Sequence, residues 1–171
     1  MSGKSIPKVT RRDAESTIAL QPAIGRTGQE HMSDNGDQSS SSELRGKVLY
    51  IEDNPINMDL IETALEVYPG VTLIKAQTGM EGIKLARSER PDFVLLDMHL
   101  PDIGGLEVVR ALNEEIASGK LRVTLLTADT LSMDIVKAMS LGAYDYWLKP
   151  LSMTKFEAGL RRALTRKDTA P

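Results

Sequence analysis

Short apolar runs alternate with amphipathic stretches over most of this 171-residue chain. Five of the runs have the length and composition of β-strands: residues 47–51, 72–76, 93–97, 122–126 and 144–148. The first and third contain the segments VLYI and FVLL, which lack charged residues as strands covered on both faces do. The runs therefore predict a buried parallel sheet whose successive strands are joined by helices.

Between the strands, apolar positions recur at helical spacing after residues that can cap a helix. Asn54 can cap a first helix with Pro55 in its first turn. Thr78 and Glu81 form a capping box for a second helix. The apolar positions expected on one face of the first helix are Ile56, Leu60, Ala64 and Val67.

Three further helices complete the alternation. Residues 106–116 predict a third helix that ends near Gly119, and residues 131–141 predict a fourth that Gly142 closes. Ser152 can cap a fifth helix, whose apolar face consists of Phe156, Leu160 and Leu164. Five strand–helix units predict an α/β fold of the flavodoxin-like (βα)5 type, with a doubly wound parallel five-stranded sheet in strand order 2-1-3-4-5.

The amino-terminal part of the chain differs in composition. Residues 1–46 contain eight of the 13 serines and none of the seven aromatic residues, and their six basic and six acidic side chains cancel. Because such a stretch has little apolar surface to bury, we predict a disordered tail over residues 1–45, a domain at 46–167 and a short tail at 168–171. A docking or localisation role is the alternative for the first tail, and Met32 is an alternative natural start.

Composition excludes several classes of protein. The 21 basic and 24 acidic residues give a net charge of −3, which argues against a nucleic-acid partner. The absence of cysteine excludes disulfides, thiolate-bound metals and thiol catalysis. No apolar run reaches the roughly 18–20 residues that span a bilayer, and no signal peptide is evident. We therefore expect a cytoplasmic protein with no membrane partner.

Polar residues follow the ends of four predicted strands. Glu52 and Asp53 come directly after the first strand, and Asp97 ends the third. Thr127 and Lys149 follow the fourth and fifth. Because ligands of open α/β sheets bind beyond the carboxyl ends of the strands, these five residues are expected to meet at one edge.

The three acids point to a cation. Carboxylates a few ångströms apart repel by roughly 1–4 kcal/mol per pair, so the fold gains nothing from such a cluster unless a cation lies among them. An all-oxygen donor set favours Mg²⁺. In the alternative interpretation, Glu52 and Asp53 are helix-terminal acids that complement the helix dipole.

The remaining residues fit phosphoryl transfer. The Lys149 ammonium can bind a phosphoryl oxygen beside Asp97, and the Thr127 hydroxyl can donate a further hydrogen bond. Asp97 can then act as a nucleophile that forms an acyl phosphate. Two alternatives stay open, since a Lys-Pro pair can simply end a strand and threonine is a common strand residue.

These residues also follow the order of a known family. The motif positions are Glu52-Asp53, Asp97 with Pro101 and Gly105, Thr127-Ala128 and Lys149-Pro150. As a set, over about residues 46–166, they resemble the receiver domain of two-component response regulators. The segment IEDNPIN at residues 51–57 is similar to stand-alone receivers and to those attached to hybrid sensor kinases.

The resemblance implies a role for each residue of the acidic cluster. Asp97 would accept a phosphoryl group from a phosphohistidine of a sensor histidine kinase or a histidine phosphotransfer protein. Asp53, Asp97 and the backbone carbonyl of His99 would bind Mg²⁺ directly, and Glu52 would act through water. The domain would then be a phosphoacceptor that catalyses only its own phosphorylation and slow dephosphorylation, not a conventional enzyme.

The resemblance also implies a switch. Thr127 and Lys149 would contact the phosphoryl oxygens, and Tyr146 matches an aromatic residue that turns inward on activation. A plain core aromatic is the alternative for Tyr146, whereas Trp147 should face the opposite side and pack. Gly104 stands at a position, just before Gly105, where members of the family frequently have an acidic residue.

Phosphate lifetime and output depend on the surroundings of the site. In the family, the positions of His99 and Asp129 tune the lifetime of the phosphate. Because the chain ends soon after the fifth helix, output is expected through protein contact at the surface of the fourth helix, fifth strand and fifth helix. The residues expected to be exposed there are Lys137, Met139, Tyr144 and Lys155. The same surface is compatible with a homodimer.

Three alternatives to a stand-alone phosphoacceptor follow from the same residues. The chain could be a receiver fragment of a hybrid sensor kinase, or an interaction module that keeps the fold but takes up no phosphate. A hydrolase that forms an aspartyl phosphate, of the haloacid-dehalogenase type, needs a second acid where this chain has His99.

Overall fold

The computed structural model describes residues 44–130 and 132–165. In this part of the chain, five parallel strands form one sheet in the order β2-β1-β3-β4-β5. The strands are β1 (Gly46–Ile51), β2 (Val71–Ala76), β3 (Phe93–Asp97), β4 (Val123–Thr127) and β5 (Asp145–Leu148). The flavodoxin-like fold and its strand order are therefore confirmed. The tails predicted at 1–45 and 168–171 lie almost wholly outside the described residues.

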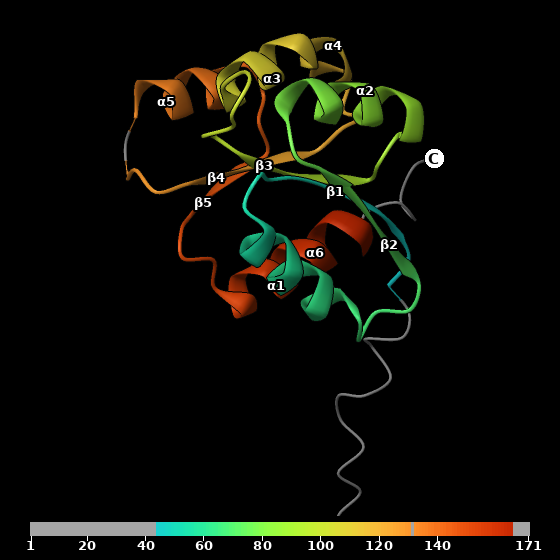
Figure 1. Ribbon diagram of the computed structural model, residues 1–171. Helices are drawn as coiled ribbons and strands as arrows, with labels where there is room; N and C mark the ends of the chain where they lie inside the picture. The colour runs from blue at the N-terminus through green and yellow to red at the C-terminus, as the bar shows by residue number, and fades with distance from the viewer. Residues whose placement is uncertain (1–43, 131, 166–171) are drawn as a thin grey trace, which may run out of the picture. The chain divides into compact units, whose positions relative to one another are not determined.

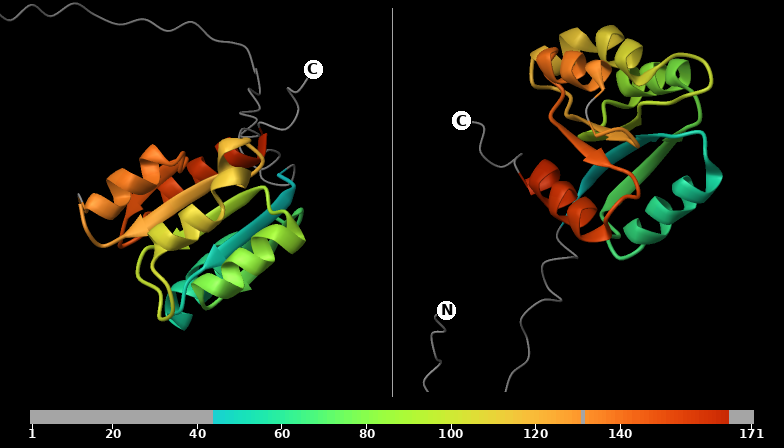
Figure 2. Two further views of the ribbon diagram at one scale, coloured as in Figure 1. Left: turned by 90° about the horizontal axis from the view of Figure 1, so that it is seen from above. Right: turned by 90° about the vertical axis from the view of Figure 1, so that its left-hand side faces the viewer.

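Helices cover both faces of the sheet, as Figures 1 and 2 show. They are α1 (Pro55–Leu65), α2 (Gly79–Glu89), α3 (Gly105–Ala111), α4 (Asn113–Ala117), α5 (Met133–Ser140) and α6 (Met153–Leu164). The helices α2 to α5 lie on one face, and α1 and α6 lie on the other. Within the described residues, no helix has the length and apolar character needed to cross a bilayer.

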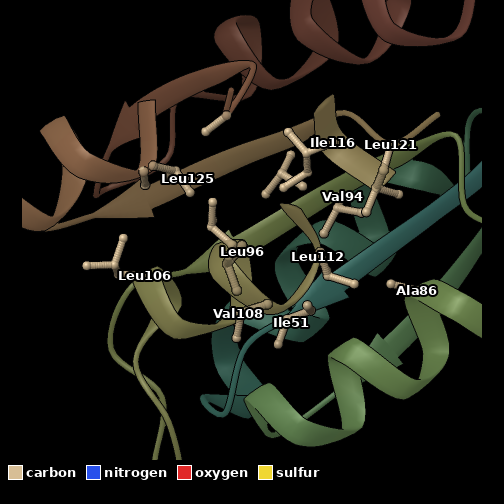
Figure 3. Close-up of a cluster of buried hydrophobic side chains, with 14 of the residues drawn as sticks. Ile51, Ala86, Val94, Leu96, Leu106, Val108, Leu112, Ile116, Leu121 and Leu125 are labelled. Atoms are coloured by element: carbon tan, nitrogen blue, oxygen red, sulfur yellow. The ribbon is translucent and has the colours of Figure 1, made fainter. Parts of the chain in front are cut away.

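The core is divided into two clusters by the sheet. The upper cluster lies under α2 to α5, and Figure 3 shows side chains of β1, β3 and β4 packed there against Leu106, Val108 and Leu112. The lower cluster lies against α1 and α6. Because alternate side chains of a strand point to opposite faces, Ile51 enters the upper cluster and Tyr50 the lower.

The lower cluster is built around Trp147. Its ring lies 6.1 Å from that of Phe93, and its indole N–H donates to Asp145. A Cβ at Gly159 would lie 2.3 Å from the Trp147 ring, so glycine allows α6 to approach β5 closely. Leu44, which precedes the expected start of the domain, is also buried in this cluster.

The expected buried face of α1 is wrong. The helix buries Met58, Ile61 and Leu65, whereas Ile56 is 77% and Leu60 46% exposed. Both sets recur at helical spacing, so periodicity alone could not decide between them. Packing against the sheet selects the set with Ile61 and leaves an apolar strip of α1 facing solvent.

The third predicted helix is also wrong in one respect, because it is two short helices. Leu112 separates α3 from α4, with φ −100° and ψ 14°. Leu112 and Ile116 are both buried in the upper cluster, so the apolar pattern runs through the break and gives no sign of it. The fourth predicted helix begins at Met133 after the Ser132 cap, and residue 131 lies outside the described part.

Asp102, which the sequence did not single out, caps α2 from another segment. Its two carboxylate oxygens accept hydrogen bonds from the backbone N–H groups of Gly79 and Met80, at 2.7 and 2.9 Å. Thr78 caps the same helix as predicted, accepting from the N–H of Glu81. Burial alone would raise the pKa of Asp102, but these hydrogen bonds outweigh it and lower the pKa below 3.8.

Asp102→Asn is expected to lower the free energy of unfolding by about 1 kcal/mol at pH 7, because the amide caps less well and the carboxylate is exposed to solvent. A pKa lowered by folding stabilises the protein above the unfolded-state value and loses that effect as the pH falls through the folded-state value. Urea denaturation of both proteins should therefore show a difference that shrinks from pH 7 to pH 3. A difference independent of pH would contradict this role of Asp102.

Candidate functional site: an acidic cluster with one lysine

Three carboxylates meet at the carboxyl end of the sheet. Glu52 and Asp53 follow β1, and Asp97 is the last residue of the neighbouring β3. One oxygen from each of these residues lies within 4.8 Å of the others. Glu52 and Asp97 are 1% and 4% exposed, whereas Asp53 is exposed. The predicted acidic cluster is therefore present, with two of its members withdrawn from solvent.

Lys149 bridges the two buried carboxylates. Its Nζ lies 2.9 Å from Glu52 Oε2 and 2.9 Å from Asp97 Oδ2. The backbone N–H of Lys149 donates to the carbonyl of Thr127 at 2.7 Å, which continues the β4–β5 pairing up to this residue. The expected contact with Asp97 is thus joined by a second one, to Glu52, which the sequence did not suggest.

Burial and hydrogen bonding set the pKa values of these groups. Burial raises the pKa of Asp97 above its ordinary value, although Lys149 and the N–H of His99 partly oppose it. Burial acts in the same sense on Glu52, but donors from Lys149, Asn54 and Tyr50 outweigh it and lower the pKa. For Lys149, the two carboxylates outweigh burial and raise the pKa. The two buried carboxyl groups that share the Lys149 ammonium therefore differ, because the pKa of Glu52 is lowered and that of Asp97 is raised.

The donor set suits a hard divalent cation. The cluster has three carboxyl groups, and the Lys149 ammonium contacts two of them, so acidic groups outnumber basic ones there. The His99 imidazole is not part of it, because this side chain is 67% exposed and its Nε2 lies 4.0 Å from Asp129. The backbone N–H of His99 donates to Asp97 Oδ1 at 3.1 Å. The residues present therefore fit Mg²⁺ and not a metal that prefers sulfur or nitrogen.

The Thr127 hydroxyl is turned to another partner, and Tyr146 is partly exposed to solvent. Thr127 is buried, but its hydroxyl accepts from the N–H of Asp129 at 3.0 Å and donates to the carbonyl of the same residue at 3.4 Å. Tyr146 is 37% exposed, and Trp147 faces the opposite side as expected. The rotamer of Thr127 depends on its local turn, which the sequence pattern does not reveal.

Two of the residues expected to be exposed near the output surface are half-buried. Met139 packs against the upper cluster, and the Tyr144 ring lies 6.0 Å from the guanidinium carbons of both Arg122 and Arg162. Lys137 and Lys155 are exposed, as expected.

Tyr50 belongs to the site although the sequence pattern did not single it out. It is 2% exposed, and its hydroxyl donates to Glu52 Oε2 at 3.0 Å. The signal was available, because residues two apart on a strand point to the same side and Tyr50 precedes Glu52 by two. A pocket of about 110 Å³ opens beside the site between Leu60, Lys149 and Leu151, with Tyr50 among its lining residues.

Comparison with known proteins assigns the family. Residues 48–161 match the family model of the response regulator receiver domain, and the chain belongs to this family. It is 34% identical over 109 residues to the polar-differentiation response regulator DivK of Brucella anthropi, covering 64% of this chain and 88% of that protein. Its identity to the transcriptional regulatory protein AfsQ1 of Streptomyces coelicolor is 38% over 122 residues, or 70% of this chain, and it spans only 51% of that relative.

A solved structure supports the same class. The chain resembles the receiver domain of the sensor histidine kinase PA1611 from Pseudomonas aeruginosa, with a TM-score of 0.62 and 26% identity. The match covers 71% of this chain and 98% of that domain, which was crystallised with a magnesium ion coordinated in its active site cleft. The suspected family is therefore confirmed, and the protein is a receiver of two-component signal transduction.

Proposed function

We propose that this receiver is a phosphoacceptor, in which Asp97 takes a phosphoryl group from a phosphohistidine of a sensor histidine kinase or a histidine phosphotransfer protein. The observation that carries the proposal is the buried Asp97 carboxylate, 2.9 Å from the ammonium of Lys149 and beside two further acids. Receivers of this family work with such kinases or phosphotransfer proteins, and the particular partner of this chain is part of the proposal.

In the reaction, a carboxylate oxygen of Asp97 attacks phosphorus and the P–N bond of phosphohistidine breaks. The electron pair leaves with the imidazole nitrogen, which takes up a proton from water, and Asp97 becomes an acyl phosphate. Lys149 moves its ammonium from Asp97 toward a phosphoryl oxygen and offsets the charge there. Phosphoryl transfer needs mainly such positioning and neutralisation from the protein.

We infer that Asp53, Asp97 and the backbone carbonyl of His99 hold Mg²⁺, with Glu52 acting through water. When bound, this ion supplies positive charge close to the phosphoryl oxygens. The excess of acidic over basic groups in the cluster supports the inference, as do its all-oxygen donors.

We propose that Thr127 and Tyr146 form the switch. The Thr127 hydroxyl now bonds to the backbone of Asp129, and it would exchange these partners for a phosphoryl oxygen. Tyr146 would then leave its exposed position for the space that Thr127 vacates. Phosphorylation would in this way bias a two-state equilibrium.

The output surface that we propose is formed by α5, β5 and α6. Four apolar side chains are exposed on α5 and β5, namely Met133, Val136, Tyr146 and Leu148. They suit a downstream protein or a second copy of the chain, and the net charge of −3 does not suit nucleic acid.

The phosphodonor would dock on α1, away from the proposed output surface. Ile56 and Leu60 of α1 are exposed there, next to the pocket that Leu60 and Lys149 line. Such an apolar strip close to the acceptor carboxylate suits a helical partner. A cytoplasmic location and the choice between a stand-alone receiver and a hybrid-kinase fragment remain predictions.

Incubation with acetyl phosphate and Mg²⁺ tests the proposed function. Intact-mass measurement should show the addition of one phosphoryl group to the wild-type chain and none to Asp97→Asn. Asp134→Asn, a matched change on the exposed surface of α5, should be labelled like the wild type. Equal labelling of Asp97→Asn would refute the assignment, and absence of both labelling and Mg²⁺ binding in the wild type would indicate an interaction module.

A further inference from the structure

We propose that Tyr50 is a positioning residue for phosphoryl transfer, whose hydroxyl fixes the Glu52 carboxylate and so frees Lys149 to move to the phosphoryl group. The inference rests on the proposed function, because it concerns the same site. It assigns a role to a residue of β1 whose hydroxyl donates a hydrogen bond to Glu52 and not to the group that is phosphorylated.

The geometry around Glu52 is the starting point. Its Oε2 accepts two hydrogen bonds, from the Tyr50 hydroxyl at 3.0 Å and from Lys149 Nζ at 2.9 Å. Its Oε1 accepts the backbone N–H of Asn54 at 3.1 Å. Glu52 is 1% exposed, so water contributes little to its solvation and these three donors hold its charge.

The Tyr50 hydroxyl is not explained by packing. Tyr50 is 2% exposed in the lower cluster, where phenylalanine would fill nearly the same volume without a polar atom. A buried hydroxyl is unfavourable unless it is hydrogen-bonded, and the partner that the structure gives this one is Glu52. The hydroxyl therefore belongs functionally to the acidic cluster.

The consequence concerns the movement of Lys149. The ammonium now bridges Glu52 and Asp97, and it must leave at least part of this arrangement to reach a phosphoryl oxygen. With Tyr50 in place, Glu52 Oε2 keeps a donor after Lys149 moves. Without the hydroxyl, the same movement would leave this oxygen buried with no protein donor, so Glu52 would hold Lys149 back.

Tyr50→Phe is the test, with Tyr68→Phe as the matched control. Tyr68 is also 2% exposed in the lower cluster, but it follows α1 at the other end of the sheet. At saturating Mg²⁺ and acetyl phosphate, the rate constant for phosphorylation of Tyr50→Phe should fall about tenfold. The rate constant of Tyr68→Phe should stay within roughly twofold of the wild type.

A double-mutant cycle separates positioning from general damage to the fold. If Tyr50 acts through Glu52, Tyr50→Phe should have less than roughly a twofold effect on the rate constant in a Glu52→Gln background. The same cycle in the equilibrium constant of unfolding, in Mg²⁺-free buffer, should show a coupling of about tenfold.

Three results would overturn the inference: an unchanged rate constant for Tyr50→Phe, an undiminished effect in the Glu52→Gln background, or an absent coupling in the unfolding cycle. A wild-type chain that takes up no phosphate would refute the proposed function and with it the kinetic role of Tyr50. The unfolding cycle would still report whether the Tyr50–Glu52 contact itself exists, so the two failures are distinguishable.

Discussion

Lys149→Met should slow the phosphorylation of Asp97 about a hundredfold, as loss of one charged donor at a transferring group typically does. Methionine keeps the apolar stem of the side chain and removes only the ammonium that lies 2.9 Å from both Asp97 and Glu52. The measurement is the rate of phosphoryl incorporation from acetyl phosphate at saturating Mg²⁺. Lys155→Met, at an exposed position of α6, is the control and should react like the wild type.

Lys149→Met should also change how the stability of the fold depends on pH. Without the ammonium, the pKa of Glu52 in the folded protein should rise above its unfolded-state value, and that of Asp97, which is already raised, should rise further. Groups raised in this way stabilise the fold below the unfolded-state pKa and destabilise it as the pH rises through the folded-state pKa. The stability deficit of Lys149→Met should therefore shrink from pH 7 to pH 4.

Mg²⁺ should bind Lys149→Met roughly tenfold more tightly than the wild type, because the competing cation is gone. Calorimetric titration of both proteins with Mg²⁺ measures the difference. Unchanged phosphorylation, or weaker Mg²⁺ binding than in the wild type, would show that Lys149 does not share the charge of this cluster.

Trp147→Ala should lower the free energy of unfolding by about 3–5 kcal/mol, the usual range for removal of a buried aromatic side chain. Trp147 is 1% exposed, contacts the Phe93 ring and fills the space in front of Gly159. Because the change leaves a large cavity between β5 and α6, part of the population is expected to be unfolded at 37 °C. Urea denaturation followed by circular dichroism measures the loss without relying on the tryptophan signal.

Tyr146→Ala is the matched control for this prediction. The neighbouring side chain points to the other face of β5 and is 37% exposed, so its removal should lower the free energy of unfolding by less than about 1 kcal/mol. Similar losses for the two variants would contradict the packing described for β5. A normal phosphorylation rate in Tyr146→Ala would agree with a role in the switch and not in the chemistry.

The acidic cluster was predictable because the carboxyl ends of parallel strands lie at one edge of a sheet. Once the strands were located, the carboxyl ends of parallel strands had to meet, and Glu52, Asp97 and Lys149 stand at those ends. Burial on both faces made β1 and β3 easy to recognise. The strand bounds therefore agreed with the structure to within one residue.

The errors have a different origin. α1 carries apolar residues around much of its circumference, so the choice between Ile56 and Ile61 depends on the tertiary contact with the sheet. The break at Leu112 interrupts the helix but not its apolar pattern. The apolar segment VLYI predicts only a buried strand, and three-dimensional geometry is needed to show that the Tyr50 hydroxyl reaches Glu52.

Borohydride reduction of the phosphorylated protein tests the central claim most directly, since it converts an aspartyl phosphate into homoserine at the modified position. After treatment with acetyl phosphate and Mg²⁺, peptide sequencing by mass spectrometry should find homoserine at position 97 and only in the phosphorylated sample. Homoserine at position 53 or 129 instead, or none in a chain whose mass shows a bound phosphoryl group, would contradict the account.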